Sequence, residues 1–292
     1  METDHVVGAI GVGNMGGAMA ARLLEHGWAV QVRDIDAGKV EALQALGAKA
    51  CATPADAARD AAALIVCVVD AAQAREVLFG QHGAVQALSP GAAVLLCPTI
   101  SPEDVEAFAR ELAARGFAAV DAPMSGGPVR ARDGTMSLMV ACEDAVFERH
   151  RALIETLSGK VFRISQRPGD GARTKLVNNL LAAINLGGAA EVLAMAQRMG
   201  LDPRTTLAVI QQSSGQSWIG ADRMSRAIDG DYAPRAHVSL LQKDSRLAVE
   251  AAQAAGFEGP LGPIARDLFQ RAADAGLSQL DDAALFKLLS GD

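Results

Sequence analysis

Aromatic residues and surplus positive charge are both scarce in this sequence. Only 4% of its 292 residues are Phe, Trp or Tyr, so its core must consist mainly of Ala, Leu, Val and Ile. The formal net charge is −7, and no cluster of Lys and Arg is interleaved with aromatics. Proteins that bind nucleic acid need a basic face. The composition therefore predicts an ordinary globular protein that does not bind nucleic acid.

Cysteine is also scarce, and its four copies are scattered along the chain. Neither these cysteines nor the five histidines show the spacing of metal ligands. We interpret the cysteines as reduced core thiols of a cytoplasmic protein, and we expect no metal site.

Long uninterrupted apolar runs are missing as well. The most apolar stretch, LLAAINLGGAAEVLAMA, contains Asn185, Glu191 and two glycines, which favours a buried helix over a membrane span. The N-terminal METDHVV is acidic and lacks the basic-then-apolar order of a signal peptide. We expect no association with a membrane.

Short apolar runs alternate with helical periods through the first 164 residues. The runs are VVGAI (6–10), WAVQVR (28–33), ALIVCVV (63–69), AAVLLC (92–97), FAAV (117–120), MSLMVA (136–141) and KVFRI (160–164). This alternation predicts an α/β fold with a doubly wound parallel sheet that is covered on both faces. Beyond residue 164 only helical periods follow. The sequence thus predicts a doubly wound α/β domain over 1–164 and an all-helical domain over 165–292. A helix over 170–199, about 45 Å long, would join them.

A glycine-rich loop, GVGNMGG, follows the first predicted strand and opens a helix. Gly11 permits a tight turn, Gly13 lets a pyrophosphate approach the backbone, and Gly16 lets the helix pack on the strand. Asp34 ends the next strand, about 20 residues on, where a carboxylate can accept from the adenosine ribose. The helix N-terminus favours the phosphates. Together these features predict a dinucleotide site.

Asp34 favours NAD over NADP, because a carboxylate repels a 2′-phosphate. The neighbouring Arg33 could accommodate that phosphate, so NADP stays as the less favoured alternative. A methyltransferase that binds S-adenosylmethionine is a second alternative, since it also uses a glycine loop and an acidic ribose contact.

Three later stretches carry residues suited to chemistry. In DAPMSGG, Ser125, Gly126 and Gly127 offer a hydroxyl and closely spaced N–H groups to a carboxylate. In GARTKLVNN, Lys175 and Asn179 lie four residues apart and hence on one face of the long helix. A lysine there could exchange a proton with a hydroxyl group while hydride moves.

The third stretch, KDSRLA, contains Lys243 beside an aspartate. The two could form a surface ion pair of little energetic value, or they could close over a bound nicotinamide. Spacing alone leaves both interpretations open.

The stretches GVGNMGGAMA, CPTI, DAPMSGG, GARTKLVNN, SSGQSW and KDSRLA, in this order, resemble the β-hydroxyacid dehydrogenase family. That family includes 3-hydroxyisobutyrate dehydrogenase, tartronate semialdehyde reductase and L-threonate dehydrogenase. The resemblance covers essentially the whole chain. It implies that residues 1–164 form an NAD(P)-binding Rossmann domain and that residues 165–292 form an all-helical substrate and oligomerisation domain. The stretches AREVLFGQHGAV, DGDYAP and DDAALFKLLSG are most similar to the L-threonate dehydrogenase branch.

The resemblance implies a role for each site residue. Lys175 would be the catalytic acid and base, with Asn179 as its helper, in a cleft between the two domains. The substrate would contact Ser125, Gly126, Gly127 and Trp218, although Trp218 could equally be a helix-packing residue. The cofactor would contact Gly11, Val12, Gly13, Asn14, Met15, Asp34, Val69, Asp70, Thr99 and Lys243.

The predicted reaction is an NAD-dependent interconversion of a small anionic hydroxy acid and its oxo acid or semialdehyde. L-Threonate is the favoured substrate type, with 3-hydroxyisobutyrate and tartronate semialdehyde as alternatives, and a non-catalytic NADH-binding protein as an alternative of another class. Arg130 and Arg132 could be solvated surface residues or could reach a second polar group of the substrate. The family suggests a homodimer or homotetramer.

Overall fold

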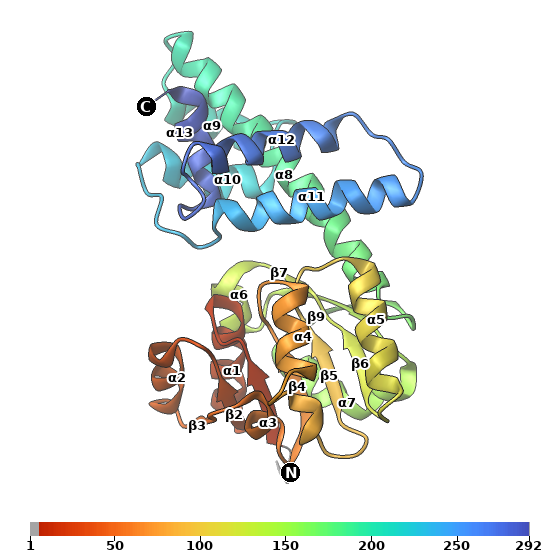
Figure 1. Ribbon diagram of the computed structural model, residues 1–292. Coiled ribbons are helices and arrows are strands. Elements are labelled where there is room, and N and C mark those ends of the chain that lie inside the picture. Colours follow the sequence, from red (N-terminus) through yellow and green to blue (C-terminus); the bar gives the residue numbers. More distant parts are fainter. Residues whose placement is uncertain (1–5, 292) are drawn as a thin grey trace. The chain divides into compact units, whose positions relative to one another are not determined.

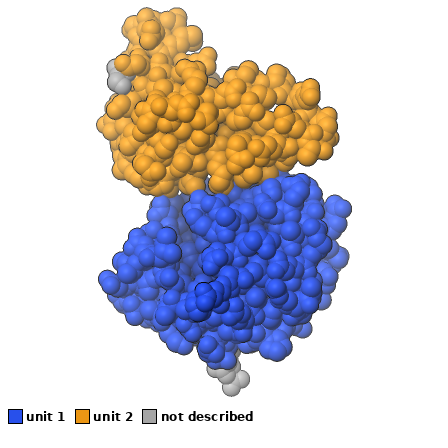
Figure 2. Space-filling model, in the orientation of Figure 1, with its two compact units in different colours: residues 1–175 blue, residues 176–292 orange. Residues whose placement is uncertain are grey.

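The structure, a computed structural model, describes residues 6–291 and consists of two compact units (Figures 1 and 2). The first unit ends at Lys175 and the second begins at Leu176, so the division falls inside one long helix. Residues 1–5, which belong to the acidic N-terminal stretch METDHVV, lie outside the described range.

The first unit is built on a nine-stranded sheet with the spatial order β3-β2-β1-β4-β5-β6-β8-β7, and β9 pairs with β8. The strands are β1 (Val6–Ile10), β2 (Ala29–Arg33), β3 (Lys49–Ala50), β4 (Ala61–Val66), β5 (Ala93–Leu96), β6 (Ala118–Asp121), β7 (Met124–Ser125), β8 (Ser137–Ala141) and β9 (Lys160–Ser165). The helices between them are α1 (Asn14–Glu25), α2 (Ala37–Gln44), α3 (Pro54–Ala58), α4 (Ala71–Phe79), η1 (Ala84–Gln86), α5 (Pro102–Ala113), α6 (Gly127–Asp133) and α7 (Asp144–Leu157).

Both faces of this sheet are covered, as the sequence predicts. Alternate residues of β5 enter two separate cores: Ala93 and Leu95 pack with α1 and α7, whereas Val94 and Leu96 pack with α3, α4 and α5. A parallel strand that is buried on both sides consists of a continuous apolar run, so polar and apolar residues do not alternate in AAVLLC. The doubly wound Rossmann arrangement is confirmed.

The sheet departs from a purely parallel arrangement beyond β6. The strands from β3 to β6 are mutually parallel, but β8 runs antiparallel to both β6 and β7. Only the short α6 lies between β7 and β8, and a parallel connection needs a longer crossover. The full-length α7 then supplies such a crossover, so β9 is again parallel to β8.

The predicted long helix is unbroken and spans Asp170–Arg198 as α8. Among the described residues it is the one helix long and apolar enough to cross a membrane by length and composition. Its residues Ala183, Leu186, Ala190 and Leu193 are buried in the core of the second unit. We therefore interpret α8 as the central core helix of that unit.

The start of α8 is held by a buried carboxylate. Asp121, the last residue of β6, is 1% exposed and accepts through Oδ2 from the backbone N–H of Gly169 at 2.8 Å and of Ala172 at 3.0 Å. Gly171 lies against the same group, since a Cβ there would be 2.9 Å from the Asp121 carboxylate. The end of a sheet strand thereby fixes the first turn of the helix that carries Lys175.

The second unit is all-helical and packs around α8. Its further helices are α9 (Pro203–Gln211), α10 (Trp218–Ile228), α11 (Val238–Ala254), α12 (Leu261–Asp274), η2 (Asp282–Ala284) and α13 (Leu285–Ser290). One apolar cluster unites residues of these helices with those of α8, so this unit has a core of its own.

Replacing Asp121 by Ala should destabilise the protein by about 3 kcal/mol, because two buried N–H groups lose their acceptor. Asp121→Asn should cost much less, since the amide oxygen can accept from both groups. Burial raises the pKa of Asp121 from 3.8 to about 6, so its contribution to stability is present at low pH and is lost as pH rises through about 6. In urea unfolding between pH 4 and 8, the free energy of unfolding of Asp121→Asn should lack the decrease that this carboxyl group causes in the wild type. Equal stability of the Ala variant and the wild type would contradict the anchoring role.

Candidate active site

The glycine loop connects β1 to α1 at the carboxyl end of the sheet. Gly11 has a φ of +83°, and a Cβ there would lie 2.6 Å from the carbonyl oxygen of Cys67. At Gly16 a Cβ would lie 2.0 Å from the carbonyl oxygen of Gly11, so the helix packs tightly against the loop. Gly13 has nothing within 4 Å of its missing side chain, which leaves its backbone open to a ligand. The three positions thus fit a loop that cradles a pyrophosphate.

The other loop residues complete the start of α1. Asn14 is the first residue of the helix and Met15 the second, and the preceding Val12 is buried. A helix N-terminus presents unsatisfied N–H groups and partial positive charge, which suit a phosphate.

Asp34 ties the end of β2 to this loop. Its Oδ2 accepts from the backbone N–H of Val12 at 2.7 Å, and its Oδ1 accepts from that of Asp36 at 2.9 Å. Each carboxylate oxygen has a second lone pair, so the group can still accept from a ribose hydroxyl. The loop and the acidic residue therefore form one hydrogen-bonded unit, with the residue types that an adenine dinucleotide requires.

Val69, Asp70 and Thr99 follow β4 and β5 at the same edge, because carboxyl ends of parallel strands meet there. Asp70 caps α4 by accepting from the backbone N–H of Gln73 at 2.8 Å. Val69 is 51% exposed, and its N–H donates to the side chain of Gln73. Exposed apolar surface at this edge suits the lining of a nucleotide site.

Ser125, Gly126 and Gly127 follow β6 and open α6. Ser125 pairs with Ser137 of β8, while Gly126 and Gly127 have φ values of +135° and +76°. Both conformations favour glycine, because residues with side chains rarely adopt a positive φ. Such a backbone can direct successive N–H groups toward one anion. The stretch is partly buried, in keeping with a small binding surface.

Lys175 and Asn179 lie one turn apart on α8, and both side chains are largely buried, with 8% exposed. Asn179 is fixed by two neighbours. Its Nδ2 donates to Oδ2 of Asp244 at 2.6 Å, and its Oδ1 accepts from Asn178 at 3.0 Å.

Asp244 joins Asn179 to Lys243. Its other carboxylate oxygen, Oδ1, accepts from Nζ of Lys243 at 2.8 Å. Asp244 is 6% exposed, so the interpretation of this pair as a surface salt bridge is wrong. The sequence indicates this aspartate only as the partner of Lys243, and no local pattern predicts its bond to Asn179.

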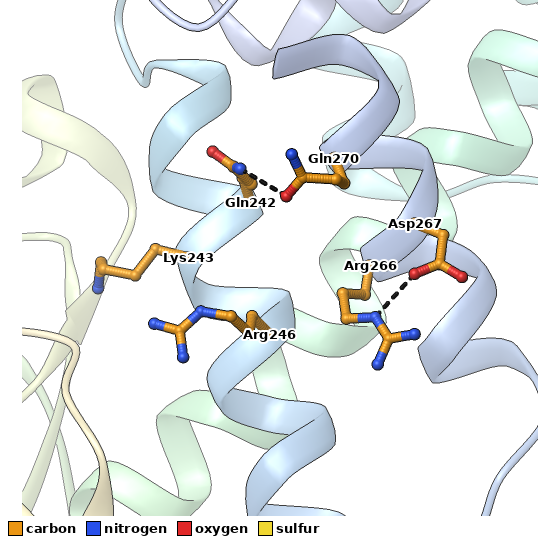
Figure 3. Close-up of a pocket in the computed structure, with 6 residues that line it drawn as sticks. All are labelled: Gln242, Lys243, Arg246, Arg266, Asp267 and Gln270. Atoms are coloured by element: carbon orange, nitrogen blue, oxygen red, sulfur yellow. Dashed lines mark hydrogen bonds and ion pairs between the residues drawn. The ribbon is translucent and has the colours of Figure 1, made fainter. Parts of the chain in front are cut away.

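A hollow of about 330 Å³ lies between α11 and α12 (Figure 3). Lys243 lines it from α11 and points away from Arg266 and Asp267 of α12. Each of its cations has a carboxylate partner: Lys243 pairs with Asp244, Arg266 with Asp267, and Arg246 with Glu250. The hollow therefore offers little net charge, and Lys243 is the member that it shares with the candidate site.

Trp218 is the first residue of α10 and is half exposed. Helix α10 is held by buried ion pairs, in which Arg226 donates to Asp281 at 2.6 Å and Arg223 pairs with Asp282. It packs on α8 where a Cβ at Gly220 would lie 3.0 Å from Ala189, about 15 Å along the helix from Asn179.

The structure thus gathers most of the predicted residues into two groups. Those between Gly11 and Gly127 lie along the carboxyl edge of the sheet, and Asp244 brings Asn179 and Lys243 together in the second unit. Lys175 lies one turn before Asn179 on α8, and Trp218 lies at the start of α10. The four cysteines are free thiols. Within residues 6–291 no group of three or more His, Cys, Asp or Glu could hold a metal ion.

Family models match both parts of the chain. A model of the NAD binding domain of 6-phosphogluconate dehydrogenase matches residues 6–165. A model described as the NAD-binding part of NADP-dependent 3-hydroxyisobutyrate dehydrogenase matches residues 169–289.

Individual proteins match over nearly their full length. L-Threonate dehydrogenase of Escherichia coli (strain K12) is 37% identical, over 99% of this chain and 96% of that protein. The crystal structure of 3-hydroxyisobutyrate dehydrogenase from Salmonella typhimurium matches with a TM-score of 0.92 and 36% identity, over 98% of this chain and all of the other. The structure of Psf3 in complex with NADP⁺ and 2-OPP matches with a TM-score of 0.90 and 28% identity, over 97% of this chain and all of that one. The chain belongs to the β-hydroxyacid dehydrogenase family of NAD-binding oxidoreductases.

Proposed function

We propose that this protein is an NAD-dependent dehydrogenase that oxidises L-threonate, or a small hydroxy acid very like it, to the oxo acid. The observation that carries the catalytic part is the pair Lys175 and Asn179, one turn apart on α8, with the amide held by Asp244. Relatives named for L-threonate favour that substrate. 3-Hydroxyisobutyrate and tartronate semialdehyde are the alternatives within the family, and family membership removes the methyltransferase alternative.

In the proposed mechanism, Ser125, Gly126 and Gly127 bind the substrate carboxylate and Lys175 lies at its hydroxyl group. The bound nicotinamide supplies the hydride acceptor. Lys175 takes the hydroxyl proton as the carbon is oxidised, and returns it when the reaction runs in reverse. Asn179 orients the lysine and the substrate oxygen, because its amide is already fixed by Asp244 and Asn178. Trp218 forms part of the wall of the substrate pocket.

The cofactor would lie along the carboxyl edge of the sheet. Gly11, Val12, Gly13, Asn14 and Met15 would hold its pyrophosphate, and Asp34 its adenosine ribose. Val69, Asp70, Thr99 and Lys243 would line its remaining length. Asp34 supports NAD as the cofactor, because the carboxylate would meet the 2′-phosphate of NADP.

We further propose that the protein is a cytoplasmic homodimer or homotetramer. Three apolar side chains of α8 are more than half exposed, namely Val177, Leu181 and Met195, and so is Met199 directly after the helix. Exposed apolar side chains along one helix are typical of a surface that another subunit covers.

The wild type should bind NADH at least about 10-fold more tightly than NADPH, because an ionised Asp34 repels the 2′-phosphate. Asp34→Ser should reduce the preference for NADH over NADPH. It should also weaken the binding of NADH, since the loop loses the hydrogen bond from Val12 to Asp34. Asp36→Ser is the matched control: Asp36 caps α2 and should leave the ratio unchanged. Nicotinamide fluorescence titrations measure both dissociation constants, and a wild type that prefers NADPH would refute the assignment.

Lys175→Ala should lower kcat by at least about 100-fold, because the reaction loses its proton acceptor. NADH binding should persist. Arg173→Ala, which removes a cation from the same turn, should stay within roughly 3-fold of the wild type. Steady-state rates of NAD reduction with the preferred hydroxy acid test this. Full activity of the Lys175 variant would end the catalytic assignment, and an inactive wild type would favour a non-catalytic NADH-binding protein.

A panel of hydroxy acids of three and four carbons should give the highest kcat/KM with L-threonate and NAD. The same panel should include 3-hydroxyisobutyrate and glycerate as oxidation substrates and tartronate semialdehyde with NADH as a reduction substrate. A higher kcat/KM with 3-hydroxyisobutyrate would move the assignment to that branch of the family. The rate of absorbance change at 340 nm is the measurement.

A further inference from the structure

The side chain of Arg130 packs directly on Gly126. A Cβ at Gly126 would lie 3.0 Å from Cδ and 3.2 Å from Cβ of Arg130, so the aliphatic stem covers the middle residue of the stretch Ser125–Gly127. The arginine side chain is itself partly buried. Because its guanidinium group is attached at Cδ, the charge begins one bond away from this contact.

Arg132, the other arginine of α6, serves a different surface. Two positions along a helix correspond to a turn of about 200°, so Arg130 and Arg132 point to opposite sides. Arg132 forms an ion pair with Glu25 of α1. The sequence offered both arginines as candidates for a polar group of the substrate, and the structure separates them.

The surface formed by Ser125, Gly126 and Gly127 contains only neutral donors. A hydroxyl group and backbone N–H groups can bind a carboxylate, but taking that charge out of water is costly unless a cation accompanies it.

Asp133, the acidic residue of α6, accepts from both the backbone N–H and the hydroxyl of Thr135. Hydrogen bonds from Thr135 are the main reason that its pKa is lowered, with smaller contributions from Arg22 and Arg130.

We propose that Arg130 is a substrate-binding residue that supplies the positive charge of the carboxylate site formed with Ser125, Gly126 and Gly127. This inference rests on the proposed function, since it assumes that the hydroxy acid binds at that stretch. A guanidinium group pairs with a carboxylate through two parallel N–H donors, so Arg130 would also fix the orientation of the acid. It would select acids over uncharged alcohols of the same size.

The test separates charge from packing. Arg130→Met keeps an unbranched stem over Gly126 and removes the charge, whereas Arg130→Lys keeps a charge without the paired donors. Arg132→Met is the control on the opposite side of α6. Each variant and the wild type are assayed with L-threonate, or with whichever panel acid proves best, and with the uncharged amide of the same acid. KM, kcat, the NADH dissociation constant and the melting temperature are measured for each.

Arg130→Met should raise KM for the acid about 10- to 100-fold with little change in kcat, in the NADH dissociation constant or in KM for the amide. The ratio of kcat/KM for the acid to kcat/KM for the amide should therefore be smaller in Arg130→Met than in the wild type, by the same factor. Arg130→Lys should recover part of the loss, and Arg132→Met should behave like the wild type.

An unchanged acid-to-amide preference in Arg130→Met would overturn the inference, as would a loss shared equally by acid and amide, which indicates packing alone. These outcomes are distinct from failure of the proposed function. In that case the wild type oxidises no acid of the panel, or Lys175→Ala stays fully active.

Discussion

The hydrogen bonds from Gly169 and Ala172 to the buried carboxylate of Asp121 are the constraint on which the candidate site depends. Lys175 lies one turn beyond Ala172, so the contact of this first turn with the end of β6 fixes where that lysine lies relative to the sheet. The same helix continues into the core of the second unit through Ala183 and Leu186. A loosened first turn would therefore displace the proposed acid and base.

Two other acidic residues are used in the same way. Asp34 holds the glycine loop through Val12, and Asp244 holds the side chains of Asn179 and Lys243. All three acids accept hydrogen bonds from N–H or ammonium groups of the protein itself. Carboxylates in these places fix the geometry of the chain, and Asp34 keeps one lone pair on each oxygen for the ribose that it would bind. Each is partly or fully buried, where such hydrogen bonds are stronger than in water.

Much of the fold follows from local patterns that one sequence displays. The apolar runs, the glycine loop and the length of α8 all depend on residues close together in the chain, and the structure confirms them. The reversal at β8 was not visible, because strand direction depends on how the chain returns from the short α6. Two-residue strands such as β3 have no periodicity to detect. The pairing of Asp244 with Asn179 joins residues 65 positions apart, and no local pattern indicates it.

Charge explains why the proposed carboxylate site needs a cation other than the proposed catalytic lysine. A lysine that accepts a proton must be neutral when it does so, and it then offers no charge to the substrate carboxylate. Arginine stays protonated under all ordinary conditions, so its charge remains constant while the lysine cycles between its two states. Because the stem of Arg130 packs against Gly126, whose backbone is in the left-handed region, the charge is kept close to the neutral donors of the Ser125–Gly127 stretch. Arg132 has the same charge but lies on the opposite side of α6, where it pairs with Glu25. The position of Arg130 on the helix, and not its residue type, therefore suits it to the carboxylate site.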